Sequence, residues 1–87
     1  MQNKEAITAM KKASTHLNNV IKMVEDNKYC IDILQQNLAV IGLLRSANSK
    51  LMERHLNSCF VKAMQGTDET KKQEMIDEIL TINKLSK

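Results

Sequence analysis

Apolar residues recur at helical spacing in three stretches of the chain, and short polar stretches separate them. Asn3 is a suitable N-cap for a first helix over about residues 4–26. A second helix is expected over about 29–64 and a third over about 69–85. Gly66, between these two, suits the left-handed position that ends a helix. The pattern predicts an all-α protein with three helices per subunit, in which residues 1–87 form one domain.

The first and third predicted helices each have one apolar side, and the second is too long for one small subunit to cover. At about 36 residues it would be on the order of 54 Å long. An 87-residue chain therefore needs a partner, which predicts a homodimer. The apolar stripes expected on the first and third helices are Ile7, Met10, Leu17, Ile21 and Val24, and Met75, Ile76, Ile79, Leu80 and Ile82.

The second predicted helix contains a heptad seam that is symmetric about its own centre. Laid antiparallel on a second copy, the seam brings Cys30 opposite His55 and Asn37 opposite Asn48. A buried Asn–Asn layer would fix the register of such a dimer and lower its stability. The alternative is an ordinary amphipathic helix that tolerates two Asn. The seam comprises Cys30, Leu34, Asn37, Ile41, Leu44, Asn48, Leu51 and His55.

Three soft donors are the candidate chemistry of the chain. His55 and Cys59 lie one helical turn apart on the same face, which suits a pair of metal ligands. Cys30 precedes them by about 40 Å along a continuous helix, so one subunit cannot close the site. Two antiparallel copies can, and the set of two thiolates and one imidazole favours Cu(I) over Zn(II), which normally takes a fourth ligand. The alternative makes both cysteines small buried hydrophobic residues and His55 a structural interface residue.

Composition narrows the function further. The net charge is +3 and the sequence pI is about 9.0, which is compatible with an anionic partner. No stretch is apolar enough to span a membrane, no signal peptide precedes the first helix, and the two cysteines are therefore expected to be cytoplasmic thiols. There is no nucleophilic triad, phosphate loop or carboxylate pair, so the protein is not expected to be an enzyme.

Two motifs resemble the copper-sensitive operon repressor (CsoR) family. They are the stretch from Met23 to Gln36, around Tyr29-Cys30, and the stretch from Leu51 to Cys59. The resemblance covers about residues 5–85 and implies a helical homodimer, usually paired into a flat homotetramer, that represses transcription from operator DNA until its effector binds. In copper members the residues matching Cys30, His55 and Cys59 bind Cu(I) across the dimer interface. Tyr29 and Glu74 match a tyrosine and a glutamate beside those ligands.

The first helix departs from the family pattern, which reads roughly R-L-x-R-x-x-G-Q. Here the two arginines are replaced by Ala9 and Lys12, and the Gly-Gln pair by Thr15-His16. Lysine supplies charge to a phosphate but lacks the bidentate fork of arginine. The candidate DNA contacts are Lys11, Lys12, Lys22, Arg45, Lys50 and Arg54, with a solvated helix face as the alternative for each.

Three functions remain open from the sequence. The first is a Cu(I)-responsive repressor that releases operator DNA when copper binds. The second is a thiol or persulfide sensor, in which Cys30 and Cys59 of partner subunits become linked through sulfur. The presence of His55 favours a metal, because persulfide sensors of the family lack that histidine. The third is a copper-binding helical protein without DNA binding, which the altered arginine pattern suggests.

Overall fold

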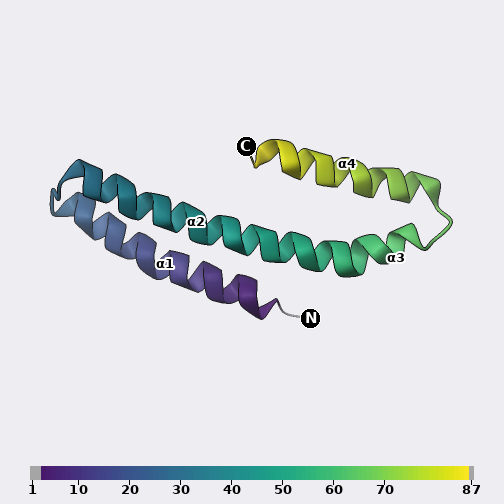
Figure 1. Cartoon of the computed structure of the whole chain (residues 1–87), viewed down its shortest axis with the longest axis horizontal. Coiled ribbons are helices and arrows are strands. Elements are labelled where there is room, and N and C mark those ends of the chain that lie inside the picture. The colour runs from purple at the N-terminus through teal and green to yellow at the C-terminus, as the bar shows by residue number, and fades with distance from the viewer. Residues whose placement is uncertain (1–2, 87) are drawn as a thin grey trace. The chain divides into compact units, whose positions relative to one another are not determined.

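The computed structural model describes residues 3–86, and every regular element in this range is helical (Figure 1). The predicted all-α class is therefore confirmed. The chain divides into two compact units, the first ending at Met52 and the second beginning at Glu53. No helix in the described range is long and apolar enough to cross a membrane. The helices are α1 (Lys4–Glu25), α2 (Cys30–His55), α3 (Val61–Met64) and α4 (Glu69–Leu85), with a π-helical segment, Leu56–Phe60, between α2 and α3.

Side-chain caps explain where α1 and α4 begin. Asn3 lies in an extended conformation before α1, and its Oδ1 accepts a hydrogen bond from the backbone N–H of Ala6 at 3.1 Å. Asp68 occupies the same position before α4 and accepts from the N–H of Lys71 at 3.1 Å. Each cap satisfies one of the N–H groups that the first turn of a helix leaves without an internal partner. Both starts agree with the sequence prediction.

The turn after α1 is a Schellman motif centred on Asn27. This residue takes the left-handed conformation at φ 55°, the N–H of Lys28 donates to the carbonyl of Met23, and the N–H of Asn27 donates to that of Val24. The expectation that Gly66 would adopt this conformation is wrong, because no glycine in the described residues has a positive φ. Asparagine tolerates the left-handed region better than most residues that carry a Cβ.

The long second helix predicted for residues 29–64 is present as a continuous helical stretch from Cys30 to Met64, but it is not uniformly α-helical. The α-helical hydrogen-bonding pattern of α2 ends at His55, and Leu56–Phe60 follow as a π-helical segment before α3 resumes the α-helix. The backbone at His55, Phe60 and Val61 stays in the right-handed helical region, so the chain changes its hydrogen-bonding step without leaving the helical conformation. This change of step falls in the stretch that contains Cys59.

The first unit is an antiparallel hairpin of α1 and α2 (Figure 1). Its core consists mostly of small residues. The buried residues are Ala6, Ala9, Ala13 and Val20 of α1, and Val40 and Ala47 of α2. Ile33 and Leu43 pack against this core. Together, these buried and packed residues form one heptad seam on each helix. The small side chains among them allow close approach of the two backbones. We call this set the inner seam.

Polar contacts fix the register of the hairpin along its length. At one end, Asn3 Nδ2 donates to the carbonyl of Lys50 at 2.9 Å, and Lys50 Nζ lies 3.1 Å from Glu5 Oε2. Further along, His16 Nε2 and Gln36 Oε1 are 2.8 Å apart. These contacts pair residues whose numbers sum to about 53, as expected for two antiparallel helices joined by a short turn.

Most of the large apolar residues predicted to form the contact side of α1 lie outside the hairpin core. Met10, Leu17, Ile21 and Val24 are all exposed, and only Ile7 is half-buried. Residues of the symmetric seam of α2 are exposed too, with Leu34 at 57% and Leu44 at 45%. We call these exposed residues of α1 and α2 the outer seam.

Both helices present the outer seam on the same side of the hairpin. On each helix, every outer-seam residue comes one position after a residue that faces the other helix of the hairpin. Leu17, for example, follows His16, and Ile41 follows Val40. One residue further along a helix, the side chain points about 100° around the axis, and in two antiparallel helices that face each other this rotation leads to the same side of the pair. One side of the hairpin is therefore largely apolar and uncovered.

The second unit places α3 against α4. Met75 of α4 is buried and Ile79 is half-buried, whereas Ile76, Leu80 and Ile82 remain exposed. The predicted apolar side of this helix is thus only partly covered within the described chain.

Candidate metal donors and basic groove

Cys30 is the first residue of α2, directly after the turn that closes the hairpin. Its thiol is free and exposed, and Asp32 is the acidic residue of the same first turn. The carbonyl of Tyr29 accepts the N–H of Ile33 at 3.1 Å, so the helix begins at a defined residue. The donor therefore sits on a rigid element while its sulfur faces outward.

His55 and Cys59 flank the start of the π-helical segment in the second unit. His55 is the last residue of α2 and is half-buried, while Cys59 lies within the segment and has a free, exposed thiol. Between them, Ser58 Oγ donates to the carbonyl of Arg54 at 2.7 Å and lies 3.8 Å from Cys59 Sγ. Because the hydroxyl has only one proton, the shorter bond to the carbonyl uses it.

The described chain does not bring its donors together. Among residues 3–86, no three His, Cys, Asp or Glu side chains are grouped closely enough to hold a metal. Cys30 and His55 are the first and last residues of the same helix, and a rise of 1.5 Å per residue separates them by about 38 Å. Neither cysteine is a core residue of the chain, so the interpretation of both as buried hydrophobic side chains does not hold within one subunit.

The two residues expected beside the donors are both exposed. Tyr29 precedes α2 and is 67% exposed, and Glu74 lies on the exposed surface of α4. They belong to different units of the chain. Their expected role beside a metal remains a prediction.

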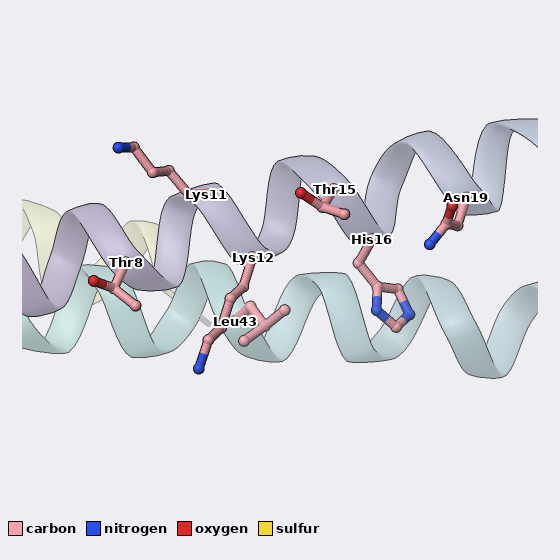
Figure 2. A pocket seen from close by; sticks show the side chains of 7 residues that line it. All are labelled: Thr8, Lys11, Lys12, Thr15, His16, Asn19 and Leu43. Carbon is pink, nitrogen blue, oxygen red and sulfur yellow. The ribbon is translucent and has the colours of Figure 1, made fainter.

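A basic groove runs along the side of the hairpin opposite the outer seam. Figure 2 shows it between α1 and α2, with Lys11 reaching out from the outer surface of α1 and Lys12 crossing toward α2. The groove has a volume of about 520 Å³, and an adjoining hollow of about 350 Å³ shares Thr8, Lys12 and Leu43 and adds Lys4 and Ser46. The residues lining the groove are Thr8, Lys11, Lys12, Thr15, His16, Asn19 and Leu43.

The structure separates the six predicted DNA contacts into groups. Lys11 and Lys12 gather at the groove, while Lys22, in the last turn of α1, and Arg45 are exposed elsewhere. Lys50 is half-buried and engaged with Glu5, so its charge is already partly neutralised. Arg54 is half-buried and, like Lys50, is not free of partners within the chain. These differences make Lys11 and Lys12 the best placed of the set.

Sequence reasoning missed the polar side chains that line the groove with the lysines. Thr8, Lys12, Thr15 and Asn19 follow one another at steps of four, three and four residues, which places them on one stripe of α1. That spacing could have identified the stripe. His16, which had no assigned role, lies at the floor between the helices and contacts Gln36.

The chain is thus a helical protein with two exposed thiols and a basic groove. Its similarity to known proteins shows which class of protein it belongs to. A profile of the metal-sensitive transcriptional repressors matches residues 2–84. The chain belongs to this family, which consists of transcriptional repressors and not enzymes. This agrees with the lack of catalytic motifs in the sequence.

Individual relatives support the same class. The copper-sensing transcriptional repressor CsoR of Mycobacterium ulcerans is 33% identical over 79 residues, covering 90% of this chain and 68% of the relative. That of Bacillus subtilis is 30% identical over 84 residues, covering 95% and 80%. The crystal structure of the copper-sensing repressor CsoR with Cu(I) from Geobacillus thermodenitrificans has a TM-score of 0.80 and 35% identity, covering 97% of this chain and 85% of that one.

Proposed function

We propose that this chain is a Cu(I)-responsive transcriptional repressor, with the whole chain acting as one metal-sensing and DNA-binding domain. The apo form binds operator DNA, and Cu(I) binding releases it. The observation that carries the proposal is that the exposed Cys30 at the start of α2, and the half-buried His55 and exposed Cys59 at and just beyond its end, accompany a self-complementary exposed seam. The similarity to copper-sensing repressors supports the choice of metal.

The metal site would be shared between two subunits. Cys30 of one subunit and the partner's His55 and Cys59 would supply two thiolates and one imidazole. This donor set fits Cu(I), which accepts soft ligands at low coordination number. The free and exposed thiols and the lack of any three-donor group within the described chain both favour this arrangement. Tyr29 and Glu74 are proposed to lie beside the ligands.

The outer seam is proposed to be the dimer interface. Leu34 and Leu44 are 57% and 45% exposed, so burying the rest of such a side chain stabilises an interface by about 1 kcal/mol, and the outer seam contains several. An antiparallel four-helix bundle results when two hairpins pair through this side. Leu38 is 64% exposed and lies outside both seams, which supports a further contact between dimers and hence a homotetramer.

Operator DNA is the proposed ligand of the basic groove. Lys11 and Lys12 would contact phosphates, while Thr8, Thr15 and Asn19 offer hydrogen-bonding groups to the same backbone. Lysines contribute charge without the fork of arginine, so we expect contacts that are strongly dependent on salt. Lys22 and Arg45 are secondary candidates because both are exposed outside the groove.

Copper would act by favouring one quaternary arrangement over another. A ligand shifts such an equilibrium only to the extent that it binds the two states differently. A site built from two subunits meets this requirement, because its affinity depends on how the subunits are placed. DNA and copper would then oppose each other through a reciprocal coupling free energy.

A thiol or persulfide sensor is the second candidate, favoured by the exposure of both cysteines. Oxidants reach exposed thiols readily. In this case the response to an oxidising sulfur species would survive His55→Ala, whereas a copper response would weaken. A copper-binding protein without DNA binding is the third candidate, because the family arginines are replaced by Ala9 and Lys12.

One titration separates these candidates. Reduced protein is titrated with Cu(I) while binding to its own upstream DNA is followed by fluorescence anisotropy at low salt. The proposal expects tight binding of the apo protein and release at about one Cu(I) per subunit. Failure of the apo protein to bind DNA at low salt would leave the copper-binding protein, and DNA release by a persulfide donor but not by Cu(I) would support the thiol sensor.

A further inference from the structure

Two asparagines interrupt the outer seam of α2 at symmetric positions. Asn37 and Asn48 are both exposed, and neither side chain makes a hydrogen bond within residues 3–86. Their neighbours along the seam are the apolar residues Leu34, Ile41, Leu44 and Leu51. A partner that covers this side of the hairpin must therefore satisfy both amides or leave them unpaired.

A second copy can satisfy them in an antiparallel arrangement in one register. When paired residue numbers sum to 85, Asn37 faces the partner's Asn48, Ile41 faces the partner's Leu44, and each layer occurs twice by symmetry. An amide carries both donors and an acceptor, so two facing asparagines can bond to each other.

Shifting the partner by one heptad breaks this match while keeping the seam apolar. In one direction Asn37 faces the partner's Ile41 and Asn48 faces the partner's Cys30; in the other Asn48 faces the partner's Leu44 and Asn37 faces the partner's His55. Both asparagine–asparagine pairs of the dimer are then lost, and in either register two of the four amides face an aliphatic side chain. Each buried amide left without a hydrogen bond weakens association by roughly ten-fold or more. Leucine in place of both asparagines would remove this penalty from the shifted registers.

We propose that Asn37 and the partner's Asn48 form two hydrogen-bonded layers that hold a second copy of this chain in a single register. The inference rests on the proposed dimer and deepens it. The same register places Cys30 opposite the partner's His55, so the amide layers position the metal donors without touching the metal. Asn37 and Asn48 are positioning residues for the site.

The register is measurable by the distance between spin labels in the full-length chain. Gln35→Cys places a label on exposed α2, in a background with Cys30→Ser and Cys59→Ser. In the proposed register the two labels are offset by 15 residues along the axis, about 22 Å. A heptad shift changes the offset to about 12 or about 33 Å, and a parallel dimer gives an offset near zero.

Three variants test the layers. With both asparagines present, one narrow distance population at the proposed offset is expected. Asn37→Leu alone leaves Asn48 unpaired and should raise the dimer dissociation constant at least ten-fold. Asn37→Leu with Asn48→Leu should restore or tighten the dimer and add the two shifted populations. Asn18→Leu, an exposed position outside both seams, is the matched control and should change neither the dissociation constant nor the distance.

The outcomes separate this inference from the function it rests on. A double variant that keeps one unshifted population, or a single variant that dimerises as tightly as the double, overturns the amide layers. A parent chain that is monomeric, or labels at near-zero offset, overturns the proposed dimer itself. A single proposed register in a protein that fails to bind Cu(I) refutes the copper function and leaves the amide layers standing.

Discussion

The two sides of the α1–α2 hairpin differ in what they offer to other molecules. One side carries the outer seam, with exposed apolar residues such as Leu17, Ile21 and Leu44. The other is a polar groove with Lys11 and Lys12 at its edge. Because the hairpin core is built largely from alanines, both sides lie close to the same thin layer of packed side chains. An apolar side suits a second subunit and a basic side suits an anionic polymer.

This comparison suggests how one short chain can link assembly to DNA binding. Each helix contributes to both sides, so in the proposed dimer a change in how the outer seams pack would also move the helix that carries the lysines. The proposed donors lie at the start of α2 and at or just beyond its end, where relative movement of two subunits would alter their separation most. The predictions below alter one side of the hairpin at a time.

A charge in the outer seam should have the largest effect. Leu44→Glu places a carboxylate opposite an apolar residue of the partner, and burying an unpaired charge is strongly unfavourable. We expect a monomer at concentrations where the parent chain is dimeric, a change of more than about 1,000-fold in dissociation constant, measured by sedimentation velocity.

The matched control for this variant is Leu38→Glu. Leu38 is exposed but lies outside both seams, so its replacement should leave the dimer intact. Circular dichroism should show retained helicity in both variants. A Leu44→Glu chain that still dimerises with parental affinity would exclude the outer seam as the interface.

Removal of the imidazole donor should weaken copper binding while sparing both sides of the hairpin. His55→Ala leaves two thiolates, which can still hold Cu(I), so we expect a loss of at least about 10–100-fold in affinity with unchanged helicity. Competition with a strong Cu(I) chelator measures the change. His16→Ala is the control for histidine loss, because His16 lies in the groove of α1. Equal affinities of parent and His55→Ala would make His55 a structural residue only.

Neutralising the basic side should reduce DNA binding without affecting assembly. Lys11→Ala with Lys12→Ala removes the lysines that border the groove. The slope of log affinity against log salt should flatten by about 0.9 for each phosphate that the protein no longer neutralises. Lys84→Ala, on α4 and not among the residues that line the groove, controls for net charge. An unchanged slope would show that the groove does not bind phosphate.

Loss of the first cap should have the smallest effect. Asn3→Ala removes the hydrogen bond to the N–H of Ala6 and the one to the carbonyl of Lys50. We expect the free energy of unfolding to fall by about 1 kcal/mol, measured by urea denaturation. Asn18→Ala, which has no capping role, should change it far less. A loss as small as that of the control would mean that the cap contributes nothing to stability.

The helix limits were largely predictable because they depend on local chemistry. Asn3 and Asp68 are capping residues by type, and Asp26-Asn27 is a turn sequence. The left-handed residue was placed wrongly at Gly66, since glycine is the usual choice and the asparagine at position 27 serves the same purpose. The π-helical segment was not predicted, because its residues are ordinary helix formers and the change lies in hydrogen bonding alone.

The packing of α1 was less predictable than its limits. Large apolar residues such as Leu17 and Ile21 dominate the hydrophobic pattern of the sequence. The hairpin core instead uses Ala9 and Ala13, which contribute little to that pattern. The large residues stay exposed in the described chain and are assigned to the proposed dimer interface. The prediction of Cys30, His55 and Cys59 as donors came from their spacing and stays a prediction. The groove depended on the relative placement of two helices and was missed.

Mixing of complementary variants tests the shared metal site most directly. Cys30→Ala chains and Cys59→Ala chains are each expected to lose high-affinity Cu(I) binding. When the two are mixed and allowed to exchange subunits, each heterodimer regains one intact site, built from Cys30 of one chain and the partner's His55 and Cys59. Titration against a chelator should therefore find about one high-affinity Cu(I) per heterodimer. No recovery on mixing, or full affinity in monomeric protein, would contradict a site shared between subunits.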